Sequence, residues 1–188
     1  MTKHHIRQLI KQTHSLYTRQ YKQEASARIV SFLRDVVPFQ SGMTVWVYTP
    51  ISNEPDITPY IAACWEQGIE TVFPCHHKTV WLFVRSPSMV PWNNHTLETD
   101  YPHTQHHLDY MLVPCVACTQ NGWRVWRWSW WYDRAIARHK ETNPALSTLC
   151  VCYSRQILDN VPVDSHDRPV DIILTEQWIL QCRDYFVE

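Results

Sequence analysis

The residues with the most chemical potential lie in one stretch, GWRVWRWSWWYDR, at positions 122–134. Five tryptophans fall within nine positions there, two arginines alternate with them, and the stretch ends in Asp133 and Arg134. Guanidinium groups bind phosphate, whereas indoles offer flat surfaces for stacking or for burial in a core. The stretch could therefore be a core strand, a base-stacking platform, or a phosphate-binding loop with the wrong residue at its glycine positions. We favour the third interpretation.

Three further groups of polar residues could take part in such chemistry. Lys3 and Arg7 are spaced by four, so they would share one helix face and could bind an anion or form an ordinary solvated face. Glu54, in SNEPD just past a predicted strand, could hydrogen-bond a polar heterocycle or belong to a turn. Asp167, in HDRPVD, could share a divalent ion with Asp133 or cap a turn. The residue types alone leave each pair of alternatives open.

The composition predicts one globular domain, residues 1–188. Of the 188 residues, 45% are hydrophobic and 19% are charged, which is enough apolar side chain for a core, and the net charge is −1. A nucleic-acid surface would show a strong excess of Lys and Arg. No apolar run is long enough to span a bilayer, and the N-terminus lacks the apolar segment of a signal peptide. We therefore expect a cytoplasmic protein with no nucleic-acid or membrane partner.

Cysteine, glycine and tryptophan occur in unusual numbers. Of seven cysteines, only Cys115 and Cys118 have CxxC spacing. No second CxxC or Cys/His pair follows at zinc-finger distance, so we expect reduced buried thiols rather than a zinc site. Glycine occurs 3 times, where average usage of about 7% would give roughly thirteen, and tryptophan occurs 10 times. Because tight turns and close backbone–ligand contacts need glycine, this imbalance is informative.

The elements that must position these residues alternate between helical and strand patterns. Apolar spacing predicts helix over residues 3–35, with a break near residues 22–24, and Pro38 ends it. Further strands and helices follow. Strands are predicted at 43–50, 69–74, 79–85, 108–114, 148–154 and 170–176, and helices within 52–68 (after a loop) and at 131–142. Residues 86–107 are predicted to be irregular, and residues 177–186 to be a short terminal helix or coil.

Strands separated by helices predict a single-domain α/β fold: a mostly parallel sheet flanked by helices, Rossmann-like and three-layered, with an N-terminal helical segment. In such sheets ligands bind at the carboxyl ends of the strands. The loops at those ends are therefore the expected site. They carry Glu54, residues 122–134 and the segment around Asp167.

An ordered set of motifs runs through the chain. The motifs are KxxIR at 3–7, YxPxxxE at 48–54, LVPxVA at 112–117, GxRVxRxSxWYDR at 122–134 and VPVDSHDRPVDIILTE at 161–176. In order and spacing, this set resembles the 5-formyltetrahydrofolate cyclo-ligase family, also called methenyltetrahydrofolate synthetase, over nearly the whole chain. The strongest pieces are the loop that ends in YDR and the closing HDxPVDxIxTE.

The chain departs at several positions from the pattern of that family, whose loop runs roughly GxRLGxGxGYYDR after a strand end VPGxAF, and Val125 replaces a family leucine. Family glycines are replaced at Trp126, Trp128, Trp130, Cys115 and Cys150, and a family phenylalanine is replaced at Cys118. A phosphate loop binds through converging backbone N–H groups, and indole volume would occupy the place of the phosphate.

Three explanations for these departures stay open. In the first, the codon written as Trp is decoded as Gly in the source organism, which does not account for the cysteines. In the second, the chain is a paralogue that keeps the fold and has lost the reaction. In the third, the loop is an aromatic surface that has taken a new ligand, with arginine stacked on indole.

The resemblance implies an enzyme, an ATP-dependent ligase that closes 5-formyltetrahydrofolate to 5,10-methenyltetrahydrofolate and releases ADP and phosphate. The alternative is a catalytically inactive folate- or nucleotide-binding paralogue of the same fold. The implied ligands are small molecules, ATP and the folate, together with Mg²⁺. We expect the protein to be a monomer.

Matching positions to the family motifs assigns the expected roles. The nucleotide site would comprise Lys3, Arg7, Arg124, Trp126, Arg127, Trp128, Ser129, Trp130, Trp131 and Tyr132. The expected catalytic residues among them are Arg124, Arg127 and Tyr132. The folate would contact Tyr48, Glu54 and Trp131, and Mg²⁺ would be held by Asp133 and Asp167. No covalent nucleophile is expected, so the cysteines need no catalytic role.

Overall fold

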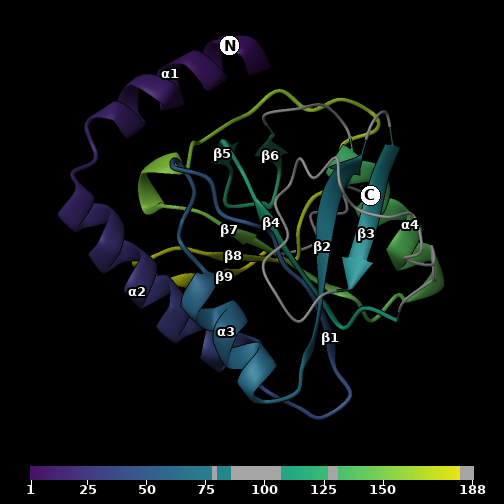
Figure 1. Ribbon diagram of the computed structural model, residues 1–188. Coiled ribbons are helices and arrows are strands. Elements are labelled where there is room, and N and C mark those ends of the chain that lie inside the picture. Colours follow the sequence, from purple (N-terminus) through teal and green to yellow (C-terminus); the bar gives the residue numbers. More distant parts are fainter. Residues whose placement is uncertain (78–79, 86–106, 127–130, 183–188) are drawn as a thin grey trace.

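A computed structural model describes residues 1–77, 80–85, 107–126 and 131–182 (Figure 1). The strands in these ranges are β1 (Thr44–Trp46), β2 (Glu70–His77), β3 (Val80–Arg85), β4 (Tyr110–Pro114), β5 (Ala117–Cys118), β6 (Arg124–Val125), β7 (Ser147–Val151), β8 (Ile172–Leu174) and β9 (Ile179–Gln181). The helices are α1 (Lys3–Ser15), α2 (Arg19–Val36), α3 (Thr58–Glu66) and α4 (Trp131–Thr142), and a short 3₁₀ turn, η1, spans Ser154–Gln156.

The described strands form a seven-stranded sheet in the order β3-β2-β1-β4-β7-β8-β9 and a small sheet of β5 and β6. Strands β2, β1, β4, β7 and β8 run parallel, whereas the two edge strands, β3 and β9, are antiparallel to their neighbours. Side chains of α2 and α3 pack on one face of the sheet, and side chains of α4 pack on the other. The predicted three-layer α/β fold with a mostly parallel sheet is confirmed.

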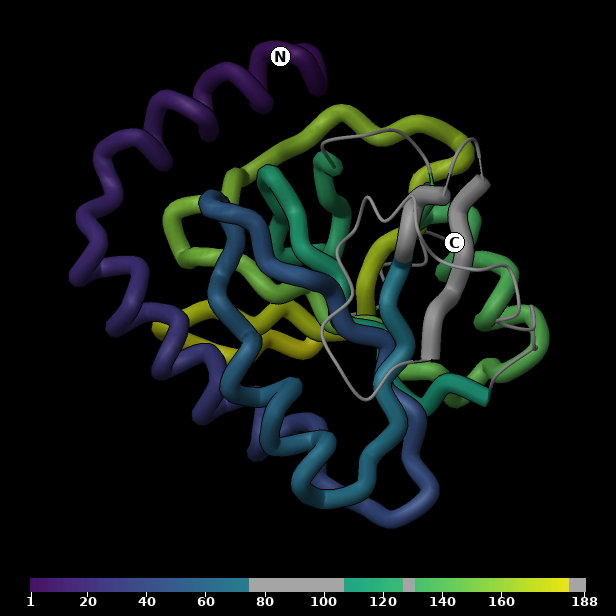
Figure 2. Tube along the Cα trace, in the orientation of Figure 1, coloured from purple at the N-terminus to yellow at the C-terminus, as the bar shows by residue number. Residues whose placement is uncertain are grey.

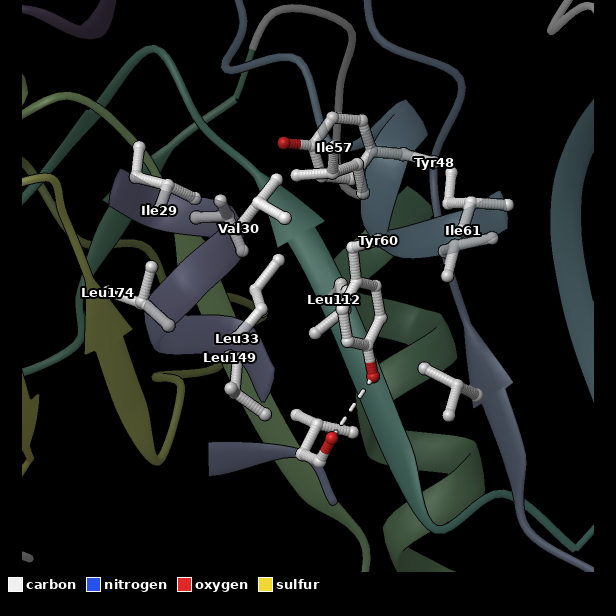
Figure 3. Packing of buried hydrophobic residues seen from close by; sticks show 14 of the residues in the cluster. Ile29, Val30, Leu33, Tyr48, Ile57, Tyr60, Ile61, Leu112, Leu149 and Leu174 are labelled. Atoms are coloured by element: carbon white, nitrogen blue, oxygen red, sulfur yellow. Dashed lines mark hydrogen bonds between the residues drawn. The ribbon is translucent and has the colours of Figure 1, made fainter. Parts of the chain in front are cut away.

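Alternation along the central strands separates two cores. Leu112 of β4 lies opposite Leu149 of β7, and both side chains point to the face covered by α2. Figure 3 shows these leucines packed against Leu33 of that helix. The next residues along the strands, Val113 and Cys150, are also register partners and point to the α4 face. Because successive side chains of a strand point to opposite faces, a single strand serves both cores.

The N-terminal helical segment breaks earlier than the sequence predicts. The predicted break near residues 22–24 is wrong, since the chain leaves α1 after Ser15 and begins α2 at Arg19. Thr18 sets this boundary: its hydroxyl accepts a hydrogen bond from the Tyr21 backbone N–H at 3.1 Å. A threonine in this position satisfies one of the N–H groups that the first helical turn leaves without a partner.

Two short hairpins were not predicted. Residues 177–186 were expected to form helix or coil, but Ile179–Gln181 form β9 on the edge of the large sheet. Inside the loop region after β4, β5 and β6 pair antiparallel, with Cys118 opposite Arg124. Strands β1 and β8 are equally short but lie within longer apolar runs, whereas β5, β6 and β9 do not, so tertiary pairing decides the latter three. The predicted irregular segment lies outside the described residues except at its last position, residue 107.

Helix α1 packs on the small hairpin rather than on the large sheet. Ile6 and Ile10 are buried against Ala117 of β5 and Val125 of β6. The trace in Figure 2 also shows the segment between η1 and β8 running toward the N-terminal end of α1. The N-terminal helix is thus fixed beside the first described part of the stretch, at Val125 and Trp126. No helix in the described part of the chain is both long and apolar enough to cross a bilayer.

Candidate functional site

Helix α1 brings two cationic side chains to loops that are distant in sequence. The Lys3 ammonium donates to Asp167 Oδ2 at 2.6 Å and to Asp164 Oδ2 at 2.8 Å. Burial of the ammonium acts to lower the Lys3 pKa, but the hydrogen bonds and charges of the two carboxylates together raise it. Arg7 Nε donates to the carbonyl oxygen of Trp126 at 2.8 Å. Lys3 and Arg7 therefore lie together with the 122–134 stretch and the Asp167 loop.

Gly122 makes the turn that opens the stretch. Its φ angle is +84°, and Val170 N donates to its carbonyl oxygen at 3.1 Å. A Cβ atom at this position would lie 2.4 Å from the Val170 carbonyl oxygen, closer than any side chain tolerates. The turn therefore needs glycine for both its dihedral angle and its space. The chain has kept glycine here although it has replaced family glycines a few residues later.

A buried ion pair joins the hairpin to α4. Arg124 Nη2 lies 3.0 Å from Asp133 Oδ1, and the two side chains are 1% and 8% exposed. The same carboxylate oxygen accepts a hydrogen bond from the Arg168 backbone N–H at 3.0 Å. The Nε and Nη1 groups of Arg124 are buried and have no acceptor among the described residues. Buried donors of this kind mark a place for an acceptor that the protein itself does not supply.

Aromatic rings surround the same ion pair. Trp126 and Tyr132 meet edge to face, with ring centroids 4.8 Å apart, and Trp131 packs on the other side of Tyr132 at 5.0 Å. The Arg124 guanidinium lies 5.8 Å from the centre of the Tyr132 ring. Tyr132 is buried, and burial raises its pKa far above the usual range, so it stays neutral. Trp126 thus directs its indole into the protein and does not form an open stacking platform.

A cavity of about 250 Å³ lies beside these residues. Its walls include three predicted site residues: Arg7 of α1, Glu54 of the loop after β1, and Trp126. The remaining walls are Ile10, Lys11, His14, Asn53, Cys115 and Val116. The fold has therefore gathered a guanidinium, an ammonium, a carboxylate and an indole from separate segments around one space. Such a mixture suits a ligand that carries both anionic groups and a polar ring.

Glu54 stands between this cavity and a larger open cleft of about 940 Å³ along α2. Its Oε2 accepts a hydrogen bond from the Ile51 backbone N–H at 3.2 Å, which closes the turn that carries it. Tyr48 holds this loop in place, because its side chain is buried and its hydroxyl donates to the Pro55 carbonyl oxygen at 3.1 Å. The structure therefore gives Tyr48 a positioning contact, and its role as a folate contact stays a prediction.

Asp133 and Asp167 both border the loop of residues 164–168. Arg124 and the Arg168 backbone N–H both donate to Oδ1 of Asp133. Lys3 donates to Oδ2 of Asp167, and the Asp164 backbone N–H donates to the same oxygen at 2.8 Å. The second oxygen of Asp167, Oδ1, lies 3.8 Å from His166 Nε2. Oxygen donors of this type fit Mg²⁺, which takes one or two carboxylates together with substrate phosphates. The donor set fits the predicted ion.

Four predicted residues lie outside the described part of the chain: Arg127, Trp128, Ser129 and Trp130. Sequence reasoning also missed two residues that belong to the site. Asp164 shares Lys3 with Asp167, and its spacing of three from that residue is a signal for a local side-chain turn. His14 lies seven residues after Arg7 on α1, a spacing that places both on one helix face and along the same cavity.

The open, mostly parallel sheet with its polar site beyond the strand ends defines an α/β protein of the ligand-binding type. A model of the 5-formyltetrahydrofolate cyclo-ligase family matches residues 1–176. The chain belongs to this family.

Individual relatives agree with this assignment. The 5-formyltetrahydrofolate cyclo-ligase of Mycolicibacterium smegmatis is 25% identical over 147 residues, which cover 72% of this chain and 74% of the relative. The enzyme of the same name from Escherichia coli is 23% identical over 179 residues, covering 89% and 96%. The matches therefore extend along most of both chains.

Two solved structures share the fold. The 5,10-methenyltetrahydrofolate synthetase of Aquifex aeolicus superposes with a TM-score of 0.80 at 24% identity, covering 100% of this chain and 96% of the other. The synthetase of Mycoplasma pneumoniae gives a TM-score of 0.73 at 20% identity, covering 94% and 99%. At these identities the likeness establishes the architecture.

Proposed function

We propose that this protein is an ATP-dependent ligase that converts 5-formyltetrahydrofolate to 5,10-methenyltetrahydrofolate, with release of ADP and phosphate. The observation that carries the proposal is the set of contacts made by α1. Lys3 reaches the Asp167 loop, and Arg7 reaches the Trp126 carbonyl and the cavity that also contains Glu54. These are the family motifs brought together in one place, in a chain that belongs to the family.

The reaction needs positioning and charge more than a covalent nucleophile. The formyl oxygen takes the γ-phosphoryl group of ATP, which leaves ADP. N10 of the folate then attacks the activated formyl carbon and loses its proton, and the oxygen departs as inorganic phosphate. A phosphoryl transfer of this kind is accelerated mainly by alignment of the two reactants and by neutralisation of charge. Fixed guanidinium and ammonium groups beside a cavity supply both.

The described residues divide these tasks. Arg7, in the cavity wall, and Arg124, with two free N–H donors, would bind the phosphates. Tyr132 holds the Arg124 guanidinium and the Trp126 ring in place and is therefore a positioning residue. Glu54 would hydrogen-bond the pterin ring.

Asp133 and Asp167 would hold Mg²⁺, which would supply positive charge to neutralise the phosphates. The proposal includes small-molecule substrates only, a monomeric state and a cytoplasmic location. The net charge of −1 supports the first of these, because it provides no basic surface for nucleic acid.

The test is formation of methenyltetrahydrofolate, followed by its absorbance, with and without ATP. Arg7→Ala should lower kcat/KM for ATP about 10- to 100-fold, since a hydrogen bond to a charged group contributes about 1.5–3 kcal/mol. Arg28→Ala is the matched control: this arginine is exposed on α2 and lines neither described cavity, so its removal should leave the rate unchanged. Glu54→Gln should raise KM for the folate and leave KM for ATP largely unchanged.

A second comparison decides between an active and an inactive site. The protein with its three tryptophans and a triple variant, Trp126→Gly, Trp128→Gly and Trp130→Gly, are assayed side by side. We expect the glycine variant to bind ATP more tightly, because bare backbone N–H groups can then approach the phosphates. Absence of ATP-dependent product from both proteins would contradict the proposal, and folate or nucleotide binding without turnover would then identify an inactive paralogue.

A further inference from the structure

Cysteines converge on the α4 face of the large sheet, at the carboxyl ends of β4 and β7. Cys115 directly follows β4, and Cys150 and Cys152 lie two residues apart at the end of β7, so they point to the same side. The Sγ atoms of these three residues all lie within 4.8 Å of one another, and all three side chains are buried. Residues more than thirty positions apart in sequence therefore meet as a single group of thiols.

A fourth thiol borders the group. Cys118, on β5, is buried and belongs to the same core cluster as Cys115, Cys150 and Cys152. Its own Sγ contacts the Thr119 carbonyl oxygen at 3.4 Å, a weak partner for a thiol. The group of sulfurs within 4.8 Å of one another does not include Cys118, so its sulfur would have to move toward the other three to complete the site.

We propose that Cys115, Cys150 and Cys152, with Cys118 as the fourth ligand, form a structural zinc site. Zn²⁺ prefers tetrahedral thiolate ligands at a Zn–S distance of about 2.3 Å, which places the sulfur atoms about 3.8 Å apart. The three clustered sulfurs are already within 4.8 Å, so a contraction of about 1 Å or less completes their part of the tetrahedron. A set of sulfur ligands selects a soft, thiophilic ion over Mg²⁺ or Ca²⁺.

Arg124 supports the site independently of the sulfur geometry. It is the register partner of Cys118 across the hairpin, so both side chains stand on the same face of β5 and β6. Its Nε and Nη1 donors are buried and lack an acceptor among the described residues. Metal-bound thiolates accept hydrogen bonds and carry negative charge, so one of these donors would face a thiolate, and the other would remain for the phosphates of the proposed function. The unpaired guanidinium donors and the clustered sulfurs thus complement each other.

The site would belong to this chain rather than to its family. The resemblance places glycine at positions 115 and 150 and phenylalanine at 118, none of which can bind a metal. Cys115 also lines the 250 Å³ cavity, which gives an ion a route to the sulfurs. Zinc there would tie β4, β7 and the hairpin together directly under Arg124. The cysteines at the family's glycine positions would then cross-link these segments through the metal.

The decisive experiment measures metal in the purified full-length protein. Cells are grown with zinc, the protein is purified under reducing conditions, and its metal content is determined by mass spectrometry. We expect about one zinc per chain. Exchange for Co²⁺ should produce the intense thiolate-to-cobalt absorption and the visible bands of a tetrahedral site. Mercurial titration of the thiols should release the zinc.

Variants show whether these cysteines hold the metal. Cys150→Ala should lose the zinc and the cobalt spectrum. Cys64→Ala is the matched control, since Cys64 is equally buried but belongs to the opposite core, so its variant should keep one zinc. If Cys150→Ala does not fold, the cobalt spectrum of the wild type and the release of its zinc by the mercurial still test the proposal. The proposal is wrong if wild-type protein holds no zinc and gives no thiolate–cobalt band, or if any two of these cysteines form a disulfide.

Discussion

The two faces of the large sheet are built from alternate residues of the same strands, yet they differ in chemistry. The face under α2 and α3 is closed by branched aliphatic and tyrosine side chains, such as Leu112 and Leu149 (Figure 3). The face under α4 contains Trp46, Met111 and the cysteines at the strand ends. The first face packs like an ordinary core, whereas the second holds a buried ion pair and a thiol group next to the candidate site.

This difference separates scaffold from chemistry. On the aliphatic face the hydroxyls of Tyr48 and Tyr60 donate to backbone carbonyls, and a further polar group without a partner would be costly there. The α4 face carries the described positions at which family glycines or the phenylalanine are replaced. Cys115, Cys118 and Cys150 lie in its core, and Trp126 packs against it. If the two faces differ energetically as they do in composition, variants on one face should differ in effect from variants on the other.

The largest effect is expected for the buried ion pair on the α4 face. Arg124→Met leaves Asp133 buried without its partner, which should lower the free energy of unfolding by about 3–5 kcal/mol. The double variant Arg124→Met with Asp133→Leu removes both charges and should recover most of the loss. Urea denaturation of the wild type and the variants checks this. A single variant as stable as the wild type would show that the pair is not held in a desolvated environment.

A cavity in the aliphatic face should have a similar or slightly smaller effect. Leu33 is fully buried, and Leu33→Ala should cost about 2–5 kcal/mol through lost transfer free energy and an unfilled volume. Turnover per folded molecule should stay unchanged, because Leu33 lines neither described cavity. Denaturation and the folate assay are run on the same preparations. A Leu33→Ala variant with normal stability but an altered KM for the folate would show that this face takes part in ligand binding.

The turn at Gly122 tests how the hairpin is fixed to the α4 face. Gly122→Ala should destabilise by about 1–3 kcal/mol through its positive φ angle alone, with a further loss from the clash against Val170. Gly68→Ala is the matched control, since φ there is +70° and no atom lies within 4 Å of the added Cβ. The difference between the two melting temperatures isolates the clash. Equal losses would mean that the Val170 backbone moves aside at little cost.

The smallest effect concerns Lys3, at the exposed edge of the site. Its pKa is raised above the ordinary value of 10.5, so its stabilising contribution is fully present below that pH and is lost as the pH rises through the raised pKa. The pKa of its partner Asp164 is lowered by the Lys3 hydrogen bond, so that contribution persists above 3.8 and disappears as the pH falls further.

The measurement is the stability difference between wild type and Lys3→Met from about pH 7 to about pH 11. The difference should shrink as the pH rises. Lys11→Met, on the same helix, should show no such trend, since Lys11 has no carboxylate partner among the described residues. A constant difference for Lys3→Met would show that its ammonium does not stabilise the fold through these carboxylates.

Periodic segments allowed most of the fold to be predicted. The helix at residues 131–142 and all six predicted strands exist, because long apolar patterns are set by burial and need no knowledge of their partners. The break in the N-terminal helix was misplaced, because a single threonine cap decides it. The short pairs β5–β6 and β8–β9 depend on contacts between segments, which leave no local pattern.

The site shows the same division. The sequence by itself determined which residues could meet phosphate, folate and Mg²⁺, since motif order and residue chemistry are properties of the linear chain. Only the tertiary structure decided that Arg7 lies on the Trp126 carbonyl, that Asp164 shares Lys3, and that Cys150 and Cys152 join Cys115. The CxxC spacing alone predicted no metal site, because its partners come from a strand brought alongside by sheet pairing. Distances between such residues are fixed by packing and hydrogen bonding, which a linear sequence does not display.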